Sequence, residues 1–240
     1  MTDAGRARPG HVLRVMSYNL RDFLDDRHAA ARVVRAVDPD VLCLQEVPRR
    51  LTTEVRLPPF ARECGLLWSR RRRGSGGTAV LTAPRVRVHA ATTTRLPVRF
   101  PDRTRGYAAL DLSLPGSPPL TVVSVHLSLR ADERERHTRR LLADLSVDAA
   151  GGRGSRLVVA GDLNEGPGGR ARDLLTGSLR ILSPDEPTFP ARAPDQRLDL
   201  VLGSPGLRVR PADRVPLAEA DLVAASDHRP VWVDLDVRSV

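Results

Sequence analysis

The chain contains no lysine, and cysteine and aromatic residues are scarce. All 38 basic residues are arginine, and the 240 residues include only Cys43 and Cys64, with two Trp, two Tyr and four Phe. Two cysteines without metal-ligand spacing exclude a disulfide framework and a cysteine-based zinc site. So few aromatic side chains supply few platforms on which nucleic-acid bases could stack.

Long apolar segments are also missing. The N-terminal residues lack the apolar region of a secretory signal, and no run approaches the ~18 apolar residues of a membrane span. We therefore expect a cytoplasmic protein without integral membrane association. We also expect a monomer, with a disordered lead-in over residues 1–11 and one domain over residues 12–240.

The positive charge is concentrated in one segment. The formal net charge is +9, but residues 49–110 hold 14 arginines against three acidic residues and so carry +11, which leaves −2 for the rest. Such a basic region is typical of proteins that bind polyanions, which include nucleic acid, phosphorylated small molecules and anionic surfaces. The alternative is a solvated loop in an arginine-biased chain. The run most suited to substrate contact is Arg70, Arg71, Arg72 and Arg73.

Apolar runs alternate with helical patterns along the chain. The spacing predicts helices over 27–37 and 131–147, a short helix over 170–175, and a loop-rich segment over 48–75 that contains Pro58-Pro59. Strands are predicted over 12–20, 41–47, 76–83, 86–90, 106–114, 120–129, 156–164, 197–204, 207–215 and 228–237. This order indicates layered sheets with helices outside them.

The stretch VVAGDLNEGPGG, residues 158–169, is typical of a strand that ends in a functional loop. It is not a P-loop, because that motif requires a lysine. It is not an EF-hand loop either, because Gly166 is fifth and Asp173 twelfth when counted from Asp162, where Gly and Glu are needed at positions six and twelve. What remains is Asp162 and Asn164 just after a buried strand, with side chains on the same side of the chain.

Other apolar runs are interrupted by, or end in, residues of the same kind. A single such residue is usually a hydrogen-bonded core group. Several together are harder to explain in that way, because a buried charge costs several kcal/mol unless it is paired or bound to a metal. The set therefore indicates a shared cation or imidazole, and it consists of Asn19, Glu46, His126, Asp199, Asp227 and His228.

The motifs MSYNL, LQEV, SVHLS, AGDLNEGP, PTFP, RLDLVL and SDHRPV follow one another in a specific order. In order and approximate spacing they resemble the endonuclease/exonuclease/phosphatase superfamily, which has the DNase I-like fold. The resemblance spans residues 14–235. It implies an α+β fold, a four-layer αββα sandwich of two packed mixed sheets flanked by helices. It also implies a Mg²⁺ or Mn²⁺ ion and hydrolysis of a phosphoester.

The resemblance also implies roles for individual residues. Glu46 is expected to be the principal metal ligand, with Asn19 and Asp227 as further metal-binding residues. Asp162 is expected to orient and deprotonate the attacking water, and Asp199 to orient His228. The expected phosphate-binding residues are Arg105, His126, Asn164 and His228, and His228 is alternatively expected to act as an acid or base. Oxygen ligands favour Mg²⁺ or Mn²⁺ over zinc.

The shared motifs leave the substrate open. PDQRLDLVL replaces the PAWTDR-type stretch of phosphoinositide phosphatases, and Leu200 replaces the aromatic residue of abasic-site nucleases. The basic segment favours a phosphodiesterase or endonuclease that cleaves the nucleic-acid backbone. The alternatives are a phosphatase that acts on a small metabolite or lipid head group, and a non-catalytic polyanion-binding member of the fold.

Overall fold

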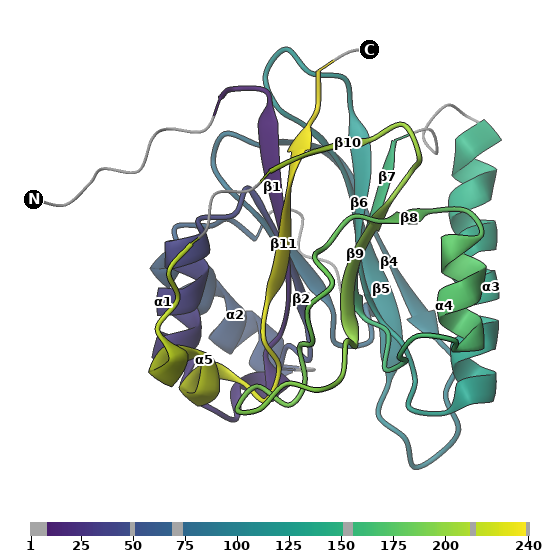
Figure 1. The fold of residues 1–240 in the computed structure, drawn as a ribbon, viewed down its shortest axis with the longest axis horizontal. Helices are drawn as coiled ribbons and strands as arrows, with labels where there is room; N and C mark the ends of the chain where they lie inside the picture. Colours follow the sequence, from purple (N-terminus) through teal and green to yellow (C-terminus); the bar gives the residue numbers. More distant parts are fainter. Residues whose placement is uncertain (1–8, 49–50, 69–73, 151–155, 212–214, 239–240) are drawn as a thin grey trace, which may run out of the picture.

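The computed structural model describes residues 9–48, 51–68, 74–150, 156–211 and 215–238, and its elements form four layers (Figure 1). Two β-sheets pack face to face in the centre, and α-helices cover their outer faces. The predicted α+β sandwich is therefore confirmed. Residues 1–8 of the expected lead-in and the run Arg70–Arg73 lie outside the described residues.

The first sheet has five strands in the order β10-β11-β1-β2-β3. β1 is parallel to β2, and the other neighbours are antiparallel. Helices α1 (Arg27–Val37), α2 (Leu51–Glu63) and α5 (Glu219–Ala225) cover its outer face. The strands are β1 (Val12–Asn19), β2 (Val41–Gln45), β3 (Ala79–Thr82), β10 (Arg208–Arg210) and β11 (Val231–Asp236).

The second sheet has six strands in the order β4-β5-β6-β7-β9-β8. β6 is parallel to β7, and the other neighbours are antiparallel. Helices α3 (Ala131–Ala150) and α4 (Arg170–Thr176) cover its outer face. The strands are β4 (Arg87–Leu96), β5 (Arg105–Ser113), β6 (Leu120–His126), β7 (Leu157–Asp162), β8 (Arg180–Ile181) and β9 (Asp199–Gly203).

Three apolar clusters hold the layers together. One lies between the sheets and includes Leu13, Val122 and Val158, and the other two lie between each sheet and its helices. β1 and β7 are buried along their whole length. Burial on both faces explains why these strands are continuous apolar runs rather than alternating ones.

The prediction of a loop-rich segment over residues 48–75 is wrong for Leu51–Glu63, which form the 13-residue helix α2. Prolines are unfavourable inside a helix, since they lack an N–H and crowd the preceding turn. Here Leu57 and Phe60 are fully buried in the cluster between α2 and the first sheet. This tertiary packing outweighs the cost of Pro58 and Pro59. α5 and β8 were not predicted, and β4 extends beyond the predicted residues 86–90.

The strand register brings the polar strand ends to one end of the sandwich, the lower end in Figure 1. Asn19 is paired with Gln45 in the first sheet, while Asp162 is paired with both His126 and Asp199 in the second. Parallel strands end together, and an antiparallel neighbour begins there. The fold therefore collects residues from remote motifs at one edge.

Candidate active site

Asp162 lies at the centre of this cluster and is 1% exposed. Its Oδ2 accepts a hydrogen bond from Asn19 Nδ2 at 3.0 Å, and it lies 3.4 Å from His126 Nε2 and 3.8 Å from His228 Nε2. Its Oδ1 accepts a bond from the backbone N–H of Asn164 at 2.8 Å. Four of the predicted site residues thus surround one carboxyl group.

Gly161 explains how Asp162 comes so close to His126. A Cβ at position 161 would lie 1.9 Å from the carbonyl oxygen of Val125, so only glycine allows β7 to approach β6 this closely. Two residues later, Asn164 has a positive φ of 49°, which asparagine tolerates better than most residues. This turn places Asn164 Nδ2 3.1 Å from His126 Nε2.

His228 belongs to a buried chain of hydrogen bonds. Its Nδ1 lies 2.8 Å from Asp199 Oδ2, and Thr188 Oγ1 donates to the same oxygen at 2.6 Å. The Phe189 ring lies against the imidazole, with the ring centroids 4.9 Å apart. Burial lowers the pKa of His228, but the charges of Asp199 and Asp162 and the hydrogen bond to Asp199 outweigh it and raise that pKa to about 10. The imidazole is therefore charged at neutral pH.

The surroundings of Asp162 favour its neutral, protonated form. Burial and the nearby Asp199 carboxylate raise the pKa of Asp162 to about 7, although His228 and the hydrogen bonds from Asn164 and Asn19 act against them. Asp162 can therefore accept and release a proton near neutral pH, which suits a general base.

We call Asp162 and the residues around it, Asn19, His126, Asn164, Asp199 and His228, the ring. Glu46 lies beside the ring, directly after β2 of the first sheet. Its backbone φ is 49°, an uncommon conformation for glutamate, and its carbonyl accepts a 2.6 Å hydrogen bond from the N–H of Asp22. Asn19 Nδ2 approaches Glu46 Oε1 at 3.4 Å. On the other side, Arg103 Nη1 lies 3.6 Å from Glu46 Oε2 and 2.6 Å from Asp22 Oδ2. One guanidinium nitrogen thus lies between two carboxylates.

The carboxylate oxygens of Glu46 and Asp22 fit Mg²⁺ or Mn²⁺ as ligands. Two carboxylates that share one guanidinium nitrogen favour a cation, and the buried Asp22 Oδ1 makes no hydrogen bond with any described residue. Hard divalent cations prefer such oxygen ligands. The amide oxygen of Asn19 accepts from the N–H of Arg21 at 3.0 Å, so Asn19 turns its nitrogen toward Glu46 and acts there as a donor.

A second group of potential metal ligands lies nearby. Asp162, Asp199 and His228 each offer one atom within 4.8 Å of the others. However, Asp199 and His228 already satisfy each other through a 2.8 Å hydrogen bond. A proton-sharing chain explains this group better than a metal cage, so Glu46 and Asp22 are the better-placed ligands.

The predicted site residues Asp227 and Arg105 are not among the ring residues. Asp227 is at the rim, where its half-exposed carboxylate lies 3.4 Å from Arg21 Nε. Arg105 is buried, and its Nε donates to the carbonyl of Leu127 at 2.9 Å. The same carbonyl accepts a bond from Asn164 Nδ2 at 3.0 Å. Arg105 therefore supports the backbone that positions Asn164.

The basic segment 49–110 does not form one basic face in the part that the structure describes. Arg85 binds Asp40 at 2.6 Å at the end of the sandwich opposite the site. Arg56 donates to a backbone carbonyl, and Arg99 forms an ion pair with an aspartate on α3. With Arg103 held by carboxylates at the site, three of the eight described arginines of the segment are paired with acidic side chains.

Three further residues of the site were not predicted. Thr188 belongs to the PTFP motif, so its position in that motif was an available signal. Asp22 follows Asn19 by three residues, in the acidic stretch RDFLDD, which offers a weaker signal. Arg103 reaches the site from the loop between β4 and β5, and nothing in its sequence context distinguishes it from other arginines.

Comparison with known proteins agrees with this geometry. The model of the endonuclease/exonuclease/phosphatase family matches residues 16–228. The chain belongs to this family. The match runs from β1 to His228 and so includes every residue of the ring. No functionally curated protein matches the chain.

Solved structures of the endonuclease/exonuclease/phosphatase family share the fold. The human nocturnin catalytic domain with bound sulfate is 22% identical with a TM-score of 0.71, covering 93% of this chain and 94% of that one. A mannosyl-6-phosphatase from Bacteroides thetaiotaomicron is 17% identical with a TM-score of 0.73, covering 93% and 99%. A family member from Beutenbergia cavernae is 22% identical with a TM-score of 0.71, covering 95% and 72%.

Proposed function

We propose that this protein is a Mg²⁺- or Mn²⁺-dependent phosphoester hydrolase. The observation that carries the proposal is the buried Asp162, surrounded by asparagine and histidine donors next to a pair of carboxylates suited to a cation. Members of the endonuclease/exonuclease/phosphatase family share this chemistry. Phosphoryl transfer requires mainly positioning and charge stabilisation, and such a ring supplies both.

Each residue has a task that follows from its surroundings. Asp162 accepts the proton of the attacking water, since its pKa of about 7 suits that transfer. Asn164 and His126 donate to the non-bridging oxygens of the phosphate. His228, held charged by Asp199, stabilises the developing negative charge. A cation held by Glu46 and Asp22 would polarise the phosphoryl oxygen.

The sequence favours nucleic acid as the substrate, through a phosphodiesterase or endonuclease activity. A phosphatase that acts on a small phosphorylated metabolite is the second candidate, and two observations support it. Three of the eight described arginines of the basic segment, Arg85, Arg99 and Arg103, form ion pairs with carboxylates. Proteins of the same fold also include a mannosyl-6-phosphatase and a 2′,3′-cyclic phosphatase.

The test is a substrate panel with purified protein and Mg²⁺ or Mn²⁺. Plasmid, single-stranded DNA, RNA, phosphomonoesters and cyclic phosphodiesters are compared, with and without a chelator. We expect Asp162→Asn and His228→Gln to lower turnover by about 10²–10⁴-fold, the usual contribution of acid–base groups. The matched control is Asp173→Asn, since Asp173 is exposed on α4.

Strand cleavage would identify a nuclease, and phosphate release without cleavage a phosphatase. The proposal is wrong if no phosphoester is turned over with either metal. It is also wrong if Asp162→Asn and Asp173→Asn have the same activity.

A further inference from the structure

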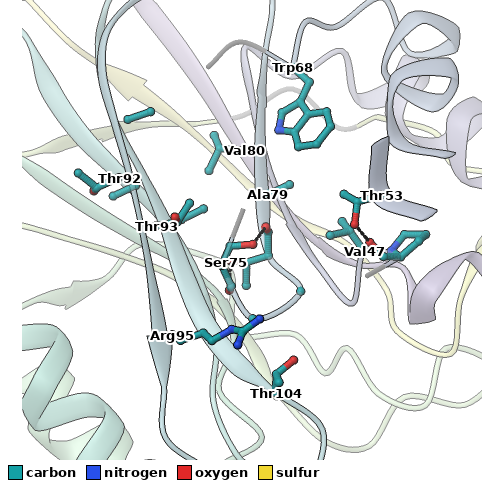
Figure 2. Close-up of a pocket in the computed structure, with 18 of the residues that line it drawn as sticks. Val47, Thr53, Trp68, Ser75, Ala79, Val80, Thr92, Thr93, Arg95 and Thr104 are labelled. Carbon is teal, nitrogen blue, oxygen red and sulfur yellow. Dashed lines mark hydrogen bonds between the residues drawn. The ribbon is translucent and has the colours of Figure 1, made fainter. Parts of the chain in front are cut away.

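A cavity of about 550 Å³ opens beside the catalytic cluster, between the edge strands of the two sheets (Figure 2). Val47 and Pro48, the two residues after Glu46, line it. Arg103 also lines it and lies 3.6 Å from Glu46 Oε2. The cavity and the site therefore share a wall, and a molecule that binds in the cavity can reach the catalytic residues.

The glycine-rich turn at 74–77 builds this wall. A Cβ at Gly76 would lie 2.1 Å from the backbone of Arg105, so the turn packs directly against the start of β5. Ser75 Oγ donates to the carbonyl of Thr78 at 2.6 Å, and Thr78 Oγ1 donates to the carbonyl of Ser75 at 2.9 Å. These reciprocal bonds hold the turn together beside the cavity.

The chemistry of the lining is polar at the sides and apolar at the base. β4 places Thr93 and Arg95 along one side, with Trp68 across from them (Figure 2). Val80 of β3 contributes to the apolar base. Among the described residues, no carboxylate forms an ion pair with Arg95, whose side chain is exposed.

We propose that this cavity binds the organic part of a small hydroxylated phosphoester, a sugar phosphate or a mononucleotide, while its phosphate lies at Asp162. The inference rests on the proposed hydrolase function and names its substrate class. Threonine hydroxyls and Arg95 can hydrogen bond to sugar hydroxyls or to a second anionic group. The volume lies in the range of about 300–1,000 Å³ that is typical of small-molecule sites.

A polynucleotide fits this cavity less well. Strand binding normally uses a long basic groove with several aromatic platforms. Among the described residues that line it, the cavity instead has one aromatic side chain, Trp68, together with apolar residues such as Val80. The chemistry shared by sugar phosphates and mononucleotides is thus favoured over that of a nucleic-acid strand.

The test compares two arginines on the same strand. Arg95→Gln alters the cavity, whereas Arg87→Gln lies at the other end of β4 and outside its lining. Glucose 6-phosphate, mannose 6-phosphate, AMP, 2′,3′-cyclic AMP and a 20-nucleotide DNA are used with Mg²⁺. We expect Arg95→Gln to raise KM for at least one small ester about 10-fold with kcat nearly unchanged, as for loss of one charged hydrogen bond. Arg87→Gln should have no effect.

Thr93→Trp provides a second variant, because Thr93 is paired with Ala108 of the cluster between the sheets and its side chain therefore faces the cavity. This variant should raise KM in the same way. The comparison of sugar phosphates with nucleotides in the panel shows which of these two classes the cavity binds. Binding of the same esters is measured by calorimetry, independently of turnover. Binding that depends on Arg95 but occurs without hydrolysis would refute the proposed function alone. Hydrolysis that neither variant alters, or cleavage of the DNA only, would overturn the cavity assignment.

Discussion

Asp199→Asn should remove the positive charge from His228 at neutral pH. Burial lowers the pKa of His228, but the charge and hydrogen bond of the Asp199 carboxylate, 2.8 Å from Nδ1, together with the charges of Asp162 and Asp227, raise it to about 10. An asparagine retains the shape without the charge, so burial then dominates. The pKa should fall to the ordinary value of about 6.5 or below, and each pH unit corresponds to about 1.4 kcal/mol. The charged imidazole thus loses on the order of 5 kcal/mol of stabilisation.

The assay is an NMR titration of the histidine ring between pH 5 and 11, in metal-free protein and with Mg²⁺. His228→Gln assigns the resonance, since the chain has six histidines. Thr188→Val is the matched control, because it removes the 2.6 Å hydrogen bond to Asp199 but leaves the carboxylate charged. In this control the imidazole should still titrate well above its ordinary range.

The same change alters the pH dependence of stability. The folded-state pKa of His228 lies above the unfolded value, so the pair stabilises the fold fully below about pH 6.5. That stabilisation is lost as pH rises through about 10. The difference in free energy of unfolding between wild type and Asp199→Asn should therefore shrink from pH 6 to pH 10. A variant imidazole that stays charged above pH 9 would refute the reasoning.

Three further predictions concern metal binding and stability. Binding of Mg²⁺ or Mn²⁺ near Asp162 should release a proton between pH 6 and 8, since a nearby cation lowers the raised pKa of Asp162. Calorimetry in buffers of different ionisation enthalpy measures this proton release. Binding heats that do not depend on the buffer would contradict the prediction. Gly161→Ala should destabilise the fold by at least about 1–3 kcal/mol, because its Cβ would overlap the backbone of Val125. Gly166→Ala is the control, since its Cβ would meet nothing within 4 Å. Equal melting temperatures of the two variants would be inconsistent with the close approach of β7 to β6. Asp234→Asn should cost about 3–5 kcal/mol in urea denaturation, because it leaves Arg14 buried without its 2.7 Å partner, yet activity per folded molecule should be retained.

The sequence motifs predicted the sandwich, and they named most of the residues that the structure gathers around Asp162, for one physical reason. Asn19, His126 and Asp162 interrupt or end buried strands, where a polar residue is conspicuous. Strand ends also meet at a common edge once the register is set. The predicted positions therefore converge without any knowledge of the loops.

The features that were missed depend on contacts between distant segments. α2 contains Pro58 and Pro59, and only its packing on the first sheet makes the helix favourable. Arg103 and Asp22 reach Glu46 from loops whose paths depend on the whole fold. Local sequence patterns hold little information about such loops, whereas strands have a period that a sequence displays.

The position of β11 has a consequence for the order in which the strands around the site can pair. β11 lies between β10 and β1, and it is the antiparallel partner of the strand that carries Asn19. Every residue of the ring precedes it, since the last of them is His228. A nascent chain that ends there holds all the residues around Asp162 but leaves β1 unpaired on one side. The strand that carries Asn19 is therefore paired on both sides only after β11 has been synthesised and inserted.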